Sequence, residues 1–202
     1  MLSTTAVQQK SASQQRIIAA ARQLFAERGF HQTAMADLAK EASVSVGAIY
    51  RSYSSKADII LDIILVDSRE ALAELQADAD MVRKDAVPVE AALEQIILRC
   101  LSYKDGALMH EILAEAHRNP QVAASISDFH VSYREIFSEL AQLARPSLSG
   151  DELEGVVELL LVCLFGLGHQ GLTRPNMDEA TTAKVMTRLI LQALGVTEDK
   201  KS

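Results

Sequence analysis

The segment from Ser45 to Lys56 combines small, hydroxyl and cationic side chains in a spacing that suits contact with a nucleic acid. Gly47 and Ala48 are small enough for a helix that enters the DNA major groove, which is about 12 Å wide. Arg51 is the side chain of this segment best suited to reading a base, through a bidentate pair with guanine. The pattern therefore predicts DNA recognition by a short helix.

Several of these side chains also have a purely structural explanation. Ser45 and Ser55 stand where a hydroxyl caps the first turn of a helix, so each suits a cap as well as a phosphate contact. Tyr53 shares its helical period with Ile49, which favours a core position for Tyr53 over a DNA contact. For Tyr50 the two interpretations stay open.

Three short helices are expected to present this segment. Ser11 and Gln14 form a capping box that opens the first helix, and Gly29 suits the left-handed residue that ends it. Thr33 is predicted to cap the second helix and Ser45 the third. The short turn between the second and third helices completes a helix-turn-helix plan. The first helix has one apolar face, formed by Ile17, Ala20, Ala21, Leu24 and Phe25.

The stretch from Arg16 to Lys56 reads RIIAAARQLFAERGFHQTAMADLAKEASVSVGAIYRSYSSK and resembles the N-terminal signature of the TetR family of bacterial regulators. This resemblance covers about a fifth of the chain. It departs from the family pattern at Ser43, where Gly is usual in the turn, and at Ala48, where Thr is common. The resemblance implies operator DNA contacts at Thr33, Ser45, Val46, Gly47, Ala48, Tyr50, Arg51 and Lys56.

The charge of the chain is unevenly distributed. Residues 1–57 hold seven Lys and Arg against three Asp and Glu, a net charge of +4. The net charge of the whole chain is −7, so the remaining residues carry −11. A basic segment on an acidic body suggests a polyanionic partner at one end, although chance is the alternative explanation.

From Ser55 onward the chain reads as a series of helices without strand alternation. We expect an all-α fold, with a three-helix DNA-binding domain over residues 1–55 and a six-helix ligand-binding and dimerisation domain over residues 56–202. Pro and Gly residues mark the breaks between the helices. The predicted helices of the second domain are 55–79, 88–103, 107–118, 121–145, 151–172 and 177–194.

The segment 151–172 is apolar on more than one side, which predicts an interface as well as a core. The TetR resemblance implies a dimer that pairs the last two helices in a four-helix bundle and presents two recognition helices to a roughly palindromic operator. The predicted dimer-interface residues are Val156, Leu160, Cys163, Leu164, Leu167, Met186 and Leu189.

The resemblance also implies a site for an apolar or amphipathic small molecule in the second domain. Each candidate taken singly is more often an ordinary core or surface residue. His110, Glu111 and His130 lack any recognised metal-ligand spacing, so no metal and no cofactor are expected. The candidate ligand-binding residues are Cys100, Met109, His110, Phe129, His130, Tyr133, Phe137 and His169.

These features predict a one-component repressor that a small molecule releases from double-stranded operator DNA. The alternative is a DNA-binding regulator controlled by a protein partner. An all-helical enzyme is far less favoured, because the sequence has no nucleophile elbow, phosphate-binding Gly loop or zinc motif. Glu111 and Glu115 share a helix face, but solvated acidic pairs are common.

A cytoplasmic location is expected, with no membrane partner. The apolar run from Val156 to Leu167 is interrupted by Glu158 and is shorter than the roughly 18–20 residues that span a bilayer. Cys100 and Cys163 are expected to be free thiols in a reducing compartment, and the N-terminus shows no apolar leader segment.

Overall fold

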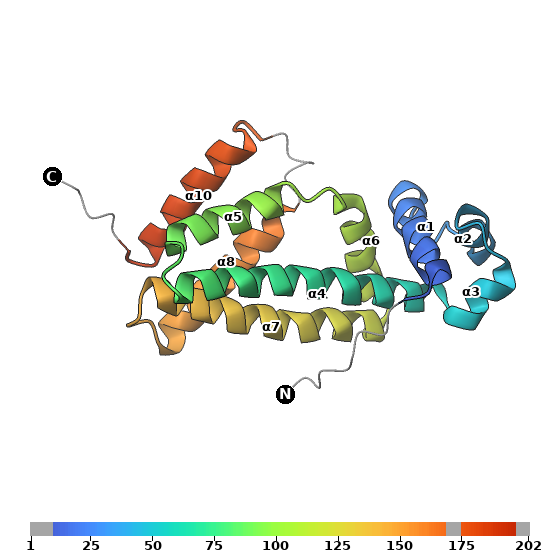
Figure 1. The fold of residues 1–202 in the computed structure, drawn as a ribbon, viewed down its shortest axis with the longest axis horizontal. Coiled ribbons are helices and arrows are strands. Elements are labelled where there is room, and N and C mark those ends of the chain that lie inside the picture. Colours follow the sequence, from blue (N-terminus) through green and yellow to red (C-terminus); the bar gives the residue numbers. More distant parts are fainter. Residues whose placement is uncertain (1–9, 169–174, 197–202) are drawn as a thin grey trace. The chain divides into compact units, whose positions relative to one another are not determined.

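The computed structural model describes residues 10–168 and 175–196, and all regular secondary structure within these ranges is helical, which confirms the predicted all-α class. The helices (Figure 1) are α1 (Ala12–Arg28), α2 (Met35–Glu41), α3 (Val46–Ser52), α4 (Lys56–Arg83), α5 (Val89–Leu101), α6 (Gly106–Ala116), α7 (Pro120–Ala144), α8 (Gly150–Leu167) and α10 (Glu179–Ala193). α4 extends beyond its predicted end at residue 79. Residues 169–172 of the predicted helix 151–172 lie outside the described residues.

The chain divides into two compact units. Unit 1 comprises Met1–Val66 and Ala107–Ser125, and unit 2 comprises Asp67–Gly106 and Ile126–Ser202. α6 therefore belongs with α1, α2 and α3, although it follows them by more than fifty residues in the sequence. α4 and α7 each contribute residues to both units. The predicted division of function after residue 55 stays a prediction.

Local signals set both ends of α1, as predicted. The Ser11 hydroxyl accepts a hydrogen bond from the Gln14 amide at 3.3 Å, and the Gln14 side chain accepts one from the Ser11 amide at 3.0 Å. The helix ends at Gly29, whose φ of 85° is a conformation that favours glycine. Phe30 folds back onto the last turn, where its ring lies 5.3 Å from that of Phe25. The chain thus reverses at a defined residue.

The predicted cap of the second helix is wrong by one residue. Ala34 is the N-cap of α2, and its amide donates to the Asp37 carboxylate at 3.0 Å. Thr33 is only 1% exposed and points inward. Its hydroxyl donates to the carbonyl oxygen of Gly29 at 2.9 Å and contacts that of Leu24 at 3.3 Å. Thr33 therefore satisfies carbonyl groups at the end of α1 instead of amides at the start of α2.

The turn of the helix-turn-helix is a Schellman motif. The amide of Ser43 donates to the Lys40 carbonyl at 3.2 Å, and the amide of Val44 donates to the Ala39 carbonyl at 2.9 Å. This pattern requires a left-handed residue at position 43, where Ser43 has a φ of 51°. A non-glycine residue in this conformation costs roughly 1–2 kcal/mol.

Two caps and two buried side chains fix the recognition segment that follows. Ser45 caps α3 by accepting from the Ala48 amide at 3.1 Å. Ser55 caps α4, as predicted, and does so in a reciprocal capping box with Asp58, with distances of 2.9 and 3.2 Å. Ile49 is fully buried and Tyr53 is nearly so, which confirms their predicted core positions.

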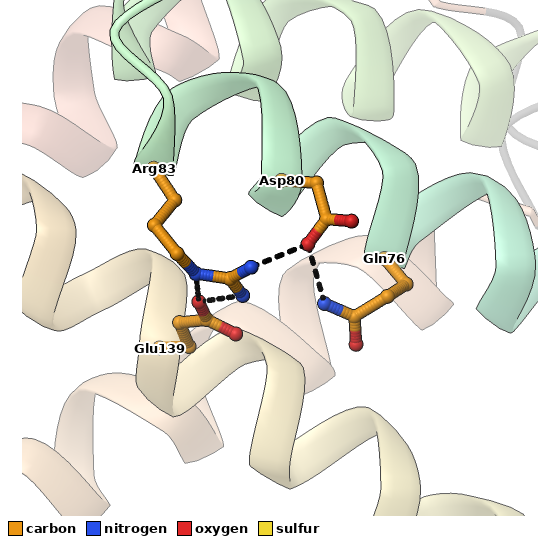
Figure 2. Close-up of polar contacts among 4 residues, drawn as sticks. All are labelled: Gln76, Asp80, Arg83 and Glu139. Atoms are coloured by element: carbon orange, nitrogen blue, oxygen red, sulfur yellow. Dashed lines mark hydrogen bonds and ion pairs between the residues drawn. The ribbon is translucent and has the colours of Figure 1, made fainter.

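Unit 2 has its own apolar core, contributed by α4, α5, α7, α8 and α10. Polar contacts join α4 to α7 at the edge of this core (Figure 2): the Arg83 guanidinium donates to Glu139, at 2.7 Å from Nε, and to Asp80 at 2.6 Å. Gln76 also donates to Asp80, at 3.3 Å. Hydrogen bonds from Arg83 and Gln76 hold the pKa of Asp80 below its usual value. These contacts are exposed, so we expect them to orient the helices more than to stabilise them.

Ser43 provides a test of the turn. Ser43→Gly removes the left-handed strain but increases the entropy of the unfolded chain, so we expect it to raise the free energy of unfolding by up to about 1 kcal/mol. Ser43→Val places a β-branched residue at a positive φ and should lower the free energy of unfolding by about 1–2 kcal/mol. Urea unfolding of the full chain measures both changes. Equal stability of the two variants would contradict this account.

Candidate functional site

α3 presents a small and mostly uncharged surface with a single cation. Val46, Gly47, Tyr50 and Arg51 are exposed, with Tyr50 at 54%, whereas Ile49 faces the core of unit 1. A Cβ atom added at Gly47 would have the Arg51 guanidinium, at 3.9 Å, as its nearest neighbour within the described residues. The backbone of α3 is therefore open to close approach at Gly47. This surface has the size and chemistry that a helix needs to enter a major groove.

The other four predicted DNA contacts are engaged within unit 1 or partly covered. The Ser45 hydroxyl caps α3, and Ala48 is half-buried. The Lys56 ammonium donates to the Phe30 carbonyl oxygen at 2.5 Å and lies 4.6 Å from the centre of the Phe30 ring. Burial lowers the pKa of Lys56, and the nearby charge of Glu115 opposes that shift. Thr33 is buried, as described above, so its hydroxyl has an internal role.

Asp62 on α4 connects the end of the recognition segment to the start of the described chain. One carboxylate oxygen accepts from the Tyr53 hydroxyl at 2.6 Å, and the other pairs with the Lys10 ammonium at 2.5 Å. Burial raises the pKa of Tyr53, and the hydrogen bond to Asp62 and its charge raise it further. Sequence reasoning missed Asp62, because nothing local marks a contact between residues nine and fifty-two positions apart.

Three of the predicted ligand-binding residues come together on α7. His130, Tyr133 and Phe137 form an aromatic cluster with Phe165 of α8: His130 stacks on Phe165 at 4.7 Å, and Tyr133 lies edge-on to Phe165 at 5.4 Å and stacked with Phe137 at 6.4 Å. Phe165 was not among the predicted ligand-binding residues, because only a contact between helices brings it here. Cys100 is partly buried and packs against the same core as Tyr133.

Burial dominates the electrostatics of this aromatic cluster. It raises the pKa of Tyr133 to about 12 and also raises the pKa of the Cys100 thiol. Burial lowers the pKa of His130, and the positive charge of Arg134 lowers it further. The neutral forms of all three side chains are therefore favoured, so the cluster is suited to an apolar or uncharged group.

The remaining predicted ligand-binding residues lie elsewhere. Met109 and His110 are half-buried residues of α6 in unit 1, and Phe129 is half-buried on α7. His169 lies outside the described residues. In the ranges 10–168 and 175–196, no group of three or more His, Cys, Asp or Glu side chains is placed to hold a metal ion.

The outward side of α8 holds few of the predicted dimer-interface residues. Leu160, Leu164 and Leu167 are buried in the core of unit 2, and Val156 and Met186 pack partly against it. The exposed apolar side chains of α8 are instead Leu159, Val162 and Phe165. Leu189 on α10, one of the predicted dimer-interface residues, is also exposed. Cys163 is half-buried. Because α8 is apolar on both sides, periodicity alone does not say which side faces outward.

Two glycines extend this outward face into a continuous stripe. Gly155, Leu159, Val162 and Gly166 follow one another at intervals of four, three and four residues, so they lie along one side of α8. A Cβ atom at Gly155 or Gly166 would meet nothing within 4 Å among the described residues. We call these four residues, with Phe165 and Leu189, the α8–α10 apolar face.

A cavity of about 190 Å³ adjoins this face where α8 begins and α10 ends. Its lining is mainly apolar, with two carboxylate side chains. None of the predicted ligand-binding residues lines it. The lining consists of Asp151, Glu152, Gly155, Val156, Leu159, Leu160, Ile190, Ala193 and Leu194.

Comparisons with known proteins agree with this geometry. The family of bacterial regulatory proteins, tetR family, matches residues 17–63, which span α1, α2, α3 and the start of α4. The HTH-type transcriptional regulator UidR of Escherichia coli (strain K12) is 35% identical over 125 residues, which are 61% of this chain and 62% of UidR. The structure of GusR from Salmonella enterica has a TM-score of 0.69 and 27% identity, over 93% of this chain and 100% of GusR.

The chain is therefore similar to TetR-family regulators, most specifically over residues 17–63. The predicted resemblance is thereby confirmed, as is the arrangement of an N-terminal helix-turn-helix followed by further helices. UidR is a transcriptional regulator, and this similarity agrees with the prediction that the chain is not an enzyme. The match to UidR leaves more than a third of that protein's length uncovered.

A more distant TetR-like structure shows the fold alone. The transcriptional regulator FadR from Bacillus subtilis, in complex with stearoyl-CoA, has a TM-score of 0.69 at 18% identity, over 89% of this chain and 98% of FadR. None of the helices among the described residues combines the length and apolarity needed to cross a membrane.

His130 predicts a specific pH dependence of stability. Because its pKa in the folded chain is lower than its ordinary value of 6.5, the unfolded chain binds the proton more readily. Its contribution to stability is therefore present above about pH 6.5 and is lost as the pH falls below that value. His130→Phe keeps an aromatic ring against Phe165 and removes the titration.

Thermal unfolding at pH values from 7.5 to roughly 5 measures this effect. We expect the melting temperature of the wild type to fall more steeply with acidification than that of His130→Phe. Comparing the two chains cancels the contribution of carboxylates that titrate in both. Parallel profiles would show that the pKa of His130 is the same in the folded and unfolded chains.

Proposed function

We propose that this chain is a dimeric transcriptional repressor of the TetR type that binds double-stranded operator DNA with α3 and is released by an apolar or amphipathic small molecule. One observation carries the DNA-binding part of the proposal. The exposed side of α3 consists of Val46, Gly47, Tyr50 and Arg51, while Ile49 anchors the opposite side in the core. A narrow helix with one guanidinium on its outer side fits base reading in a major groove.

The residues proposed to touch DNA are fewer than the sequence suggested. Arg51 is assigned to a base edge, with Val46, Gly47 and Tyr50 forming the surrounding contact surface. Ser45 is exposed, so its hydroxyl can contact a phosphate while it caps α3. Thr33 and Lys56 are instead assigned to holding the turn that follows α1.

The α8–α10 apolar face is proposed to be the dimer interface. Val162 is 70% exposed and Phe165 and Leu189 are also exposed, which is costly for a face of this kind in a single chain. Gly155 and Gly166 would allow two α8 helices to approach closely. A two-fold pair presents two copies of α3, which matches a palindromic operator.

The aromatic cluster of His130, Tyr133, Phe137 and Phe165 is proposed as part of the effector site. Its neutral, largely apolar character suits an apolar or amphipathic molecule. The FadR structure from Bacillus subtilis contains stearoyl-CoA, which is amphipathic, and this supports the class of effector. A small molecule would release DNA only through a difference in its affinity for the DNA-binding and released states.

The DNA-binding proposal is tested by selecting duplexes from a random-sequence library with the full wild-type chain. Affinities for a selected duplex are then measured by fluorescence anisotropy at several salt concentrations. Arg51→Ala should weaken binding about ten- to a hundredfold, because a base contact of this type contributes roughly 1–3 kcal/mol. Lys84→Ala, which removes an exposed cation of unit 2, should change the affinity little. Failure to enrich any duplex, or binding without salt dependence, would refute the proposal.

The dimer proposal is tested at Val162. Val162→Arg places a charge in the centre of the α8–α10 apolar face, so we expect monomers at micromolar concentration by sedimentation velocity. Helix content should be retained, because the side chain is exposed in the single chain. Val131→Arg is the matched control, because Val131 is 56% exposed on α7 and lies outside this face. A Val162→Arg chain that remains dimeric would rule out this face as the interface.

A further inference from the structure

The turn that follows α1 is held by side chains of opposite charge from two other helices. The amide of Phe30 donates to the Glu111 carboxylate of α6 at 2.7 Å. The carbonyl oxygen of Phe30 accepts from the Lys56 ammonium of α4 at 2.5 Å, and Lys56 also reaches the His31 carbonyl oxygen at 3.4 Å. Both main-chain polar groups of Phe30 are therefore fixed by charged partners, which make stronger hydrogen bonds than neutral ones.

A second carboxylate of α6 supports the same turn. Glu115, one helical turn beyond Glu111, is only 8% exposed, and its Oε2 atom has no hydrogen-bond partner among the described residues. The imidazole of His31 faces this oxygen, with its Nε2 atom 3.6 Å away. The charge of Glu115 also acts on Lys56. The expectation of a solvated acidic pair on α6 is thus wrong, because both carboxylates face the turn from Gly29 to His31.

The close fit at Gly29 strengthens this arrangement. A Cβ atom at Gly29 would lie 3.5 Å from the Glu111 carboxylate, which shows how near that group sits to the main chain. The φ of 85° at Gly29 directs the following amide toward α6. Glu111 is half-buried, and a carboxylate that is partly removed from water is stabilised by a hydrogen bond, so the Phe30 amide also holds Glu111 in place.

We infer that Glu111 is a positioning residue for DNA binding, which fixes the turn between α1 and α2 through the Phe30 amide and so sets the direction of α3. The inference rests on the proposed function. The turn leads directly into α2, and α3 packs on both α1 and α2. α2 and α3 have seven residues each, so they keep their orientation only through such contacts.

If Glu111 acts only through its charge, its removal should have the opposite effect on DNA binding from its removal as a positioning contact. Removing a carboxylate from a DNA-binding protein relieves repulsion of the phosphates and should strengthen binding if charge alone matters. Removing a positioning contact should weaken binding instead, because a smaller fraction of the molecules holds α3 correctly. The sign of the change therefore separates the two explanations.

The experiment uses full-length Glu111→Ala, Glu111→Asp and Glu111→Gln, with the duplex selected by the wild type. Glu111→Gln keeps an oxygen that can accept from Phe30, whereas Glu111→Asp keeps the charge but withdraws the carboxylate by one methylene group. We expect the Ala and Asp variants to bind about tenfold more weakly if the competent fraction falls to about a tenth. The Gln variant should bind at least as tightly as the wild type.

The control variant is Glu27→Ala, which removes an exposed carboxylate of α1 in the same unit and should not weaken binding. Amide hydrogen exchange at Phe30 gives a second measurement, with faster exchange expected in the Ala and Asp variants only. Glu111→Asp serves if Glu111→Ala fails to fold. Equal or tighter binding by folded Ala or Asp variants would overturn the inference alone. Failure of the wild type to select any duplex would overturn the proposed function and, with it, the inference.

Discussion

A helix of seven residues does not hold its shape or direction in water, because its few hydrogen bonds barely offset the cost of nucleating it. α3 is such a helix, and every property of the proposed DNA-binding surface depends on how it is anchored. Burial of Ile49 fixes one side, and the Tyr53 hydroxyl fixes the end by donating to Asp62. Apolar burial supplies the stability of this anchorage, whereas the hydrogen bonds supply its direction.

Hydrogen bonds also set the direction of the chain in the turns that precede α3. Ser43 takes a left-handed conformation so that the Schellman motif can close, and Gly29 has a positive φ that allows the chain to reverse after α1. The turn after α1 does not satisfy all of its carbonyl and amide groups with main-chain hydrogen bonds. Thr33, Lys56 and Glu111 supply the missing partners. Polar side chains that the sequence places at possible DNA contacts are thereby committed to the main chain.

The sequence predicts the features of this fold that depend on near neighbours. Capping boxes at Ser11 and Ser55 and the apolar period of α1 are set within a few residues, so they were predicted correctly. The burial of Glu115 depends on contacts about eighty residues away, and no local pattern signals it. The outward side of α8 is not predictable from the sequence for a related reason: both of its sides are apolar, and only its packing partners show that Leu160 is inside and Val162 outside.

The net charge of unit 1 differs from that of the N-terminal segment, because the folded unit includes residues from elsewhere in the sequence. Residues 1–57 carry +4, but unit 1 also includes two acidic residues of α4 and two of α6, so its eight cations face seven anions and its net charge is only +1. Lys10 and Lys56 are further engaged with internal partners. A strong overall field therefore does not draw this unit to DNA. The proposed DNA binding therefore depends on where exposed cations such as Arg51 stand, so a contact that orients Arg51 matters as much as an added charge.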